Sequence, residues 1–114
     1  MADLKTYSFV LTVSEGKRLI ARAVAALPAV QQAMQTGIVV VTKGTTNAYV
    51  AEELLGEKIA KGAYVLGRTL PAKADTSGVF AGNLPEVIFI KGVRTEVPLK
   101  DIVLQMKCGD VVLK

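Results

Sequence analysis

Between Gly37 and Gly56 the chain has the pattern of a buried strand, a tight turn and a helix, and this unit narrows the choice of fold. Ile38–Val41 is an unbroken β-branched run, which is typical of a strand covered on both faces. Ala48–Leu55 consists mostly of helix formers, and Gly56 follows where a helix-terminating glycine is expected. The unit therefore predicts an α/β fold.

The turn of this unit, Thr42–Asn47, predicts an anion site. It holds a lysine, a glycine, two threonines and an asparagine in succession, and the last three are residue types that cap helices. A helix N-terminus presents backbone N–H groups that lack helical acceptors, and its dipole favours negative charge. The spacing is not that of a P-loop, and no dinucleotide-binding glycine motif occurs. The alternative is a capped helix start that holds no ligand.

Apolar runs alternate with amphipathic segments along the rest of the chain. Expected strands, besides the central one, are Thr6–Val13, Ala63–Leu66, Val87–Ile90 and Val111–Leu113. This alternation implies right-handed crossovers and a mostly parallel sheet. We expect one domain over residues 1–114, with a Rossmann-like sheet between helices in three layers. Because the chain stops just after an apolar run, the sequence leaves open whether it is the N-terminal part of a longer protein.

The first helix is expected to begin at Glu15, behind a Ser14 cap, and to turn an apolar stripe toward the sheet. The stripe comprises Leu19, Ile20, Ala23, Val24 and Leu27, and the residues that fall away from it are Lys17, Arg18 and Arg22. Pro28 either kinks this helix or starts a second one.

Two further helical faces are predicted. A last helix after Pro98 should bury a stripe made of Leu99, Ile102, Val103 and Met106. In the helix of the central unit, Glu52 and Glu53 are expected on a solvated face, and Tyr49 either joins the core or walls the anion site.

Three segments follow predicted strands and could converge at one edge of a parallel sheet, where ligands of such folds bind. They are Thr42–Asn47, the long irregular stretch that begins at Arg68, and Lys91–Arg94. A short ribbon at Gly78–Ala81 could interrupt the irregular stretch. The candidate ligand-binding residues are Thr42, Lys43, Gly44, Thr45, Thr46, Asn47, Arg68 and Lys91.

Composition excludes several kinds of chemistry. The chain has no histidine, so histidine-based acid/base catalysis and histidine metal sites are excluded, and we expect no metal and no cofactor. Cys108 is the single cysteine, which excludes a disulfide framework and favours a cytoplasmic protein. No apolar run is long enough to span a membrane. The net charge of +4 comes from scattered cations, which makes nucleic acid an unlikely partner.

The run IVVVTKGTTNAYVAEELLG, residues 38–56, resembles the phosphate-binding strand–loop–helix of a superfamily of phosphosugar and CoA enzymes. That superfamily includes ribose-5-phosphate isomerases, glucosamine-6-phosphate deaminases and CoA transferases. The resemblance implies a Rossmann-like domain with Gly44, Thr45, Thr46 and Asn47 around a bound anion. The acidic segment that supplies catalytic carboxylates in such isomerases has no counterpart here, so the resemblance assigns no catalytic residue.

Together these features predict the binding of a phosphorylated small molecule, either a sugar phosphate or a CoA-like compound, by a protein that forms a homo-oligomer. They leave open whether the protein is an enzyme. The main alternative is a structural or oligomerisation domain without a small-molecule ligand, which would assemble regardless of phosphates. A third interpretation is a basic RNA-associated domain, which would bind nucleic acid in a salt-sensitive way.

Overall fold

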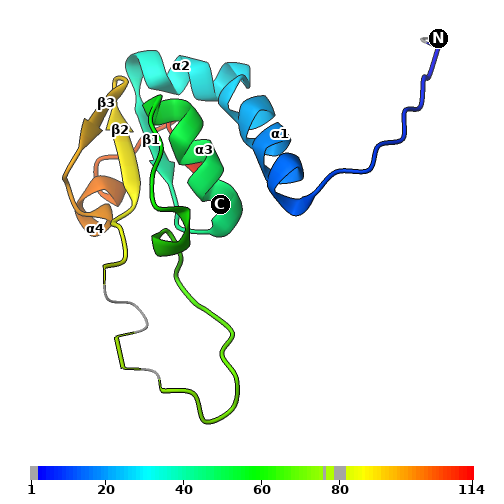
Figure 1. Ribbon diagram of the computed structural model, residues 1–114. Coiled ribbons are helices and arrows are strands. Elements are labelled where there is room, and N and C mark those ends of the chain that lie inside the picture. Colours follow the sequence, from blue (N-terminus) through cyan, green and yellow to red (C-terminus); the bar gives the residue numbers. More distant parts are fainter. Residues whose placement is uncertain (1–2, 76, 79–81) are drawn as a thin grey trace.

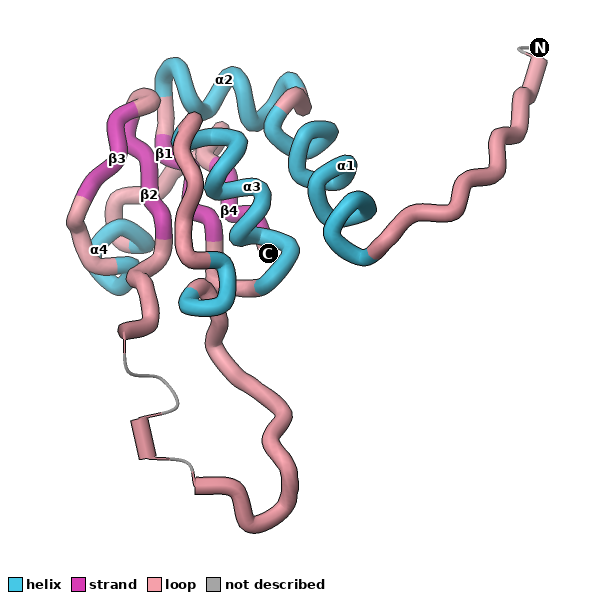
Figure 2. The backbone as a smooth tube through the Cα atoms, viewed as in Figure 1, coloured by secondary structure: helices cyan, strands magenta, loops and turns pink. Residues whose placement is uncertain are grey.

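A computed structural model of the chain describes residues 3–75, 77–78 and 82–114. It shows a mixed α/β fold in which helices flank an open four-stranded sheet (Figures 1 and 2). The helices are α1 (Val13–Ala25), α2 (Pro28–Thr36), α3 (Thr45–Leu55), the 3₁₀ turn η1 (Lys61–Ala63) and α4 (Leu99–Val103). The strands are β1 (Ile38–Val41), β2 (Val87–Ile90), β3 (Val93–Thr95) and β4 (Val111–Leu113).

The sheet has the order β3-β2-β1-β4 and is mostly antiparallel. β1 pairs antiparallel with β2 and parallel with β4, and β2 pairs antiparallel with β3. The prediction of a mostly parallel sheet is therefore wrong. The physical reason is a two-residue hairpin at Lys91 and Gly92, where φ is 49° and 79°, so β2 is followed by an antiparallel neighbour and not by a helical crossover.

Each face of the sheet covers its own cluster of buried side chains. Val39, Val41 and Phe89 point to the side of α1, α2 and α3, together with buried Ala33 and Ala51. On the opposite face, the buried side chains of Ile38, Val40 and Ile88 pack against Ile102 of α4. The central strand β1 is buried along its whole length, as its β-branched run predicts.

Several predicted elements are confirmed by the structure. β1, β2 and β4 occupy the predicted residues, Gly56 ends α3 in the left-handed conformation, and Pro28 occupies the first turn of a separate helix α2. The predicted strand Ala63–Leu66 is wrong: the end of η1 and irregular backbone stand there, although Tyr64 and Val65 are buried. The possible ribbon at residues 78–81 falls largely outside the described residues.

The predicted strand Thr6–Val13 is also wrong. Residues 3–11 form an extended arm outside the sheet, and α1 already begins at Val13. The cap is Thr12 and not Ser14, because Thr12 and Glu15 form a reciprocal capping box: each side chain accepts a hydrogen bond from the other residue's backbone N–H at 3.2 Å.

The orientation of α1 differs from the prediction as well. The helix packs chiefly against α3, and among its residues Ala21 is the fully buried one. Its predicted apolar stripe is largely uncovered, with Leu19 59% exposed and Ile20 51% exposed. α4 is likewise shorter than predicted: Ile102 is buried, but Val103 is 56% exposed.

Candidate functional site

The predicted anion-binding turn lies where β1 leads into α3. Gly44 is the N-cap of α3, with extended backbone angles (φ 167°, ψ 156°). Its N–H donates to the carbonyl oxygen of Tyr64 at 2.9 Å, and its own carbonyl accepts the N–H of Ala48 at 2.8 Å. The turn is thus held against the segment after η1 while the helix begins directly behind it.

The start of α3 has free donors. Gly44 offers no side chain, and no side-chain hydrogen bond caps the helix. Within the described part of the chain, no acceptor is recorded for the backbone N–H groups of Thr45, Thr46 and Asn47. Thr45, Thr46 and Asn47 are of residue types that cap helices, but their side chains do not cap α3, since the cap position belongs to Gly44. Their N–H groups and the helix dipole therefore favour an anion in front of the helix.

A hollow of about 400 Å³ opens at this end of α3. Its lining combines the turn with residues of α1, α3 and the end of β4: Ile20, Val24, Thr42, Lys43, Gly44, Thr45, Thr46, Asn47, Val50, Leu113 and Lys114. Six of the eight predicted ligand-binding residues thus lie together. One wall is polar and the other, formed by the α1 side chains, is apolar.

Two of the six residues hold the ends of the strands together. The side-chain amide of Asn47 donates to the carbonyl oxygens of Thr42 and Leu113, both at 3.0 Å. The backbone N–H and the hydroxyl of Thr42 also donate to the Leu113 carbonyl, each at 3.0 Å. These side chains therefore fix the carboxyl ends of β1 and β4, and we assign them a structural role at the site.

Lys17 of α1 brings positive charge to the start of α3. Its ammonium group donates to the hydroxyl of Thr45 at 2.9 Å, so it lies beside the free N–H groups of α3. No local sequence pattern predicts this role for Lys17, because its position depends on how α1 is rotated on α3. Lys43 contributes less free charge, since its Nζ lies 3.9 Å from a carboxylate oxygen of Glu86.

The other two predicted residues lie elsewhere. Arg68 is exposed, and its guanidinium donates to the carbonyl oxygen of Gly62 at 2.5 Å, outside the lining of the hollow. Lys91 lies at the opposite end of the sheet, where its N–H donates to the carbonyl of Gly37 at 2.8 Å. The predicted convergence at one edge fails for Lys91 because β2 runs antiparallel to β1.

An ionic cluster joins α1, α3 and η1 beside the hollow. Glu52 is buried, so the prediction of a solvated face is wrong for this residue. It accepts hydrogen bonds from Arg18 at 2.6 Å, from Lys61 at 3.1 Å and from the N–H of Ile59 at 3.0 Å. Burial alone raises the pKa of Glu52, but these donors outweigh it and lower the pKa to about 2.

Tyr49 belongs to this cluster and not to the lining of the hollow. The guanidinium of Arg18 lies 4.7 Å and the ammonium of Lys61 lies 5.1 Å from the centre of its ring. Both distances are within the range of cation–π attraction. The cluster orients α1 on α3, and through α1 it sets the position of Lys17.

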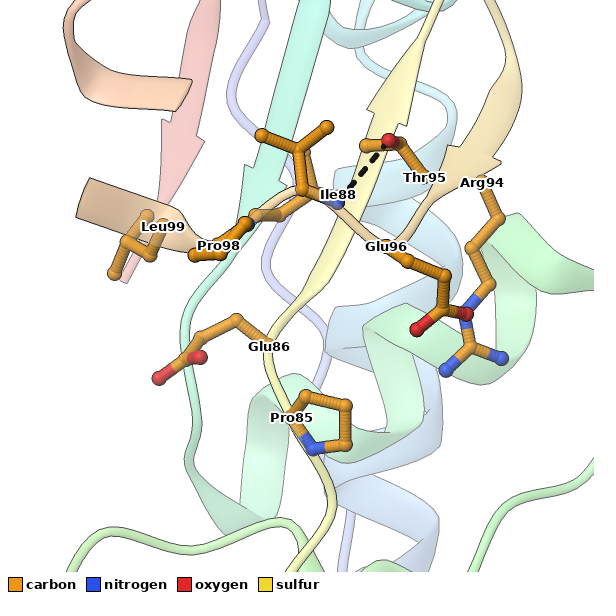
Figure 3. A pocket seen from close by; sticks show the side chains of 9 residues that line it. Pro85, Glu86, Ile88, Arg94, Thr95, Glu96, Pro98 and Leu99 are labelled. Carbon is orange, nitrogen blue, oxygen red and sulfur yellow. Dashed lines mark hydrogen bonds between the residues drawn. The ribbon is translucent and has the colours of Figure 1, made fainter. Parts of the chain in front are cut away.

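A second, smaller hollow of about 260 Å³ lies between the start of β2 and the start of α4 (Figure 3). Its lining includes Glu86, Arg94 and Glu96 between Pro85 and Pro98. The hydroxyl of Thr95 accepts a hydrogen bond from the N–H of Val97 at 3.2 Å, which fixes the bend before α4. None of the predicted ligand-binding residues lines this hollow.

The described residues contain no group of three or more histidine, cysteine or acidic side chains that could hold a metal ion. No helix in the described part of the chain is long and apolar enough to cross a membrane. Comparison with protein-family models, with curated proteins and with solved structures finds no match for this chain. The geometry of the hollow and the resemblance of residues 38–56 are therefore the grounds for a function.

Proposed function

We propose that the chain binds a phosphorylated small molecule, a sugar phosphate or a CoA-like compound, in the hollow at the N-terminus of α3. The observation that carries this proposal is the set of backbone N–H groups of Thr45, Thr46 and Asn47, which have no recorded acceptor among the described residues. Such groups at a helix start bind phosphate by direct hydrogen bonds and by the helix dipole.

The surroundings of these donors suit an organic phosphate. The ammonium of Lys17 adds a full positive charge next to the Thr45 hydroxyl, close to these donors. Ile20 and Val24 form an apolar wall for the remainder of the ligand. The volume of about 400 Å³ falls within the range of small-molecule pockets, roughly 300–1,000 Å³. An exposed, solitary Cys108 agrees with a reducing, cytoplasmic setting for such a ligand.

Thermal denaturation against a panel of phosphate, sugar phosphates, nucleotides and CoA tests the proposal. A ligand at about 100 times its dissociation constant should add roughly 2.7 kcal/mol of stability. For a domain of this size, that corresponds to a rise in Tm on the order of 10 °C. Sulfate and non-phosphorylated sugars serve as ligand controls. If no phosphorylated compound raises the Tm of the wild type, the proposal is refuted.

Two variants locate the site. Thr45→Pro removes one N–H donor at the first helical position, where proline is tolerated, so the fold should persist while the ligand-induced shift falls by about half or more. Lys17→Met should weaken binding about tenfold, whereas Lys100→Met makes the same charge change on α4 and should leave binding unchanged. Equal binding by Lys17→Met and Lys100→Met would place the ligand elsewhere.

A further inference from the structure

The N-terminal arm, residues 3–11, is an exposed extended segment outside the sheet. Figure 1 shows it leading away from the body of the molecule beyond α1. Its odd positions from Tyr7 to Leu11 are apolar and Ser8 is polar, which favours a strand with one buried face, although apolar Val10 departs from the alternation. Tyr7 is 71% exposed and Phe9 is 77% exposed. No backbone hydrogen bond is recorded for residues 3–11 within the described part of the chain.

The outer edge of β4, beneath α1, offers a position for a fifth strand. Among the described residues, β4 is the last strand of the sheet, so its outer edge has backbone donors and acceptors without a strand partner. In Figure 2, α1 extends the helical layer beyond β4. α1 packs on α3, and its apolar stripe includes Ile20 and Leu27, which are 51% and 49% exposed. Val24 meets the same core cluster as Val111 and Leu113, so α1 overhangs the face of β4 that faces the core.

The arm fits this position by its side-chain pattern. When Tyr7, Phe9 and Leu11 turn toward α1, the even positions turn to the opposite face of the sheet. The even-numbered apolar residue Val10, fully exposed in the arm, then lies on the same face as Val112, which is 52% exposed on β4. The opposite sheet edge, β3, suits the arm less well, because its middle residue is the exposed Arg94.

The arm cannot pair with β4 of its own chain unless the capping box at the start of α1 breaks. Thr12 separates the arm from α1, and its capping box with Glu15 holds the backbone extended at ψ 163°. If the arm lay beneath its own α1, the chain would have to reverse direction between the arm and the helix. Connections of that kind usually take two to six residues. The arm is therefore free to reach a neighbour and not its own sheet.

We infer that the arm of one copy adds as a fifth strand to the β4 edge of a second copy, beneath that copy's α1. Exchange in both directions gives a closed two-fold dimer. Backbone hydrogen bonds supply affinity, and the apolar alternation sets the register. The partner is thus a second copy of this chain. Because Ile20 also lines the hollow at the start of α3, an arm beneath α1 would cover part of the wall assigned to the ligand, although the inference itself is argued without phosphate binding.

Sedimentation velocity of the full chain tests the inference. The wild type should form a dimer, Phe9→Asp should raise the dimer dissociation constant at least tenfold, and Ser8→Pro should do the same by removing a backbone donor. Leu66→Asp is the matched control, because Leu66 is 71% exposed and lies outside the arm. A monomeric wild type, or a dimer that Phe9→Asp leaves intact, overturns the inference. Circular dichroism confirms that each variant is folded.

Disulfide trapping distinguishes exchange between copies from folding back. In a Cys108→Ser background, one chain carries Val10→Cys and another carries Val112→Cys. Oxidation of the mixture should give a covalent heterodimer, whereas Leu4→Cys with Lys100→Cys should not give one. A chain with both Val10→Cys and Val112→Cys that closes an internal disulfide as a monomer would show that the arm pairs with its own β4, and it would overturn the proposed exchange.

Discussion

The guanidinium of Arg18 donates a hydrogen bond to the carboxylate of Glu52 at 2.6 Å, and this pair joins α1 to α3. The carboxylate side is 3% exposed, whereas the arginine side is 30% exposed. The ammonium of Lys61 and the N–H of Ile59 donate further hydrogen bonds to this carboxylate. The ionic contact therefore helps to fix α1 on α3, beside the apolar contact made by the buried Ala21.

Glu52→Gln should destabilise the fold by about 2 kcal/mol. Removing one partner of a fully buried pair typically costs about 3–5 kcal/mol. The loss here is smaller because Arg18 and Lys61 are each about a third exposed and regain water. Glu53→Gln, the same change at the next residue, should cost under about 1 kcal/mol, as its carboxylate is 26% exposed. Urea unfolding measures both, and equal losses would contradict the role assigned to Glu52.

The depressed pKa of Glu52 predicts loss of stability in acid. The folded protein holds this carboxyl at a pKa of about 2 against an ordinary 4.5, so the unfolded chain binds a proton first as pH falls. The contribution is fully present above about pH 4.5 and is lost as pH falls toward 2. Unfolding free energies of wild type and Glu52→Gln should therefore converge between about pH 5 and pH 2. A constant difference across this range would contradict the assignment.

The local elements were largely predictable because their signals lie close together in the sequence. Ile38–Val41 and Val87–Ile90 are unbroken apolar runs next to glycines, and both are buried strands in the structure. The hairpin after β2 also had a signal that the interpretation missed: Lys91 and Gly92 stand between two strand-forming runs. The antiparallel pairing of β1 with β2 had no local signal, since it joins residues about fifty positions apart.

The candidate site was predictable in place but not in detail. The free N–H groups follow from a helix that starts behind a glycine, and the sequence around Gly44 indicates such a start. The structural role of Thr42 and Asn47 is to donate hydrogen bonds to the carbonyl of Leu113, which is 66 to 71 positions away in the sequence. The placement of Lys17 depends on the rotation of α1. The strongest apolar stripe of that helix predicted the wrong face: α1 contacts α3 through buried Ala21 and through ion pairs of Arg18 and Arg22 with Glu52 and Glu53.

Gly37→Ala should destabilise the fold through a single contact. A Cβ at Gly37 would lie 2.5 Å from a carboxylate oxygen of Asp110, so that side chain must move. Asp110 accepts the N–H groups of Ile38 and Lys107, both at 2.8 Å, and these bonds hold its pKa below the ordinary value and join the starts of β1 and β4. The backbone of Gly37 is extended (φ −136°), so no conformational strain is added.

The expected loss for Gly37→Ala is about 1–3 kcal/mol in chemical denaturation. Gly16→Ala is the matched control, because nothing lies within 4 Å of a Cβ at Gly16. Alanine inside a helix is better than glycine by about 0.5–1 kcal/mol, so the control should be stabilising. A neutral or stabilising Gly37→Ala would show that the Asp110 contact does not hold the two strands.

Tyr64→Phe should weaken the end of the β1–β2 ladder. The buried hydroxyl of Tyr64 donates to the carbonyl of Val41 and accepts the N–H of Val87 at 2.8 Å, and these two valines are paired in the sheet. Phenylalanine fills the same space but leaves a buried donor and a buried acceptor unpaired, at a cost of about 2–3 kcal/mol. Tyr7→Phe, in the exposed arm, should cost nothing measurable in a monomeric sample.

The same hydroxyl predicts a response to alkali. Burial raises the pKa of Tyr64 to about 12, even though the hydrogen bond from Val87 acts in the opposite direction. The unfolded chain loses this proton near its ordinary value of 10.0, so wild-type stability should fall as pH rises from about 10 to 12. Tyr64→Phe removes this titration, and its unfolding free energy should fall less steeply over the same range. Identical slopes for the two proteins would mean that the Tyr64 hydroxyl is accessible to water in the folded state.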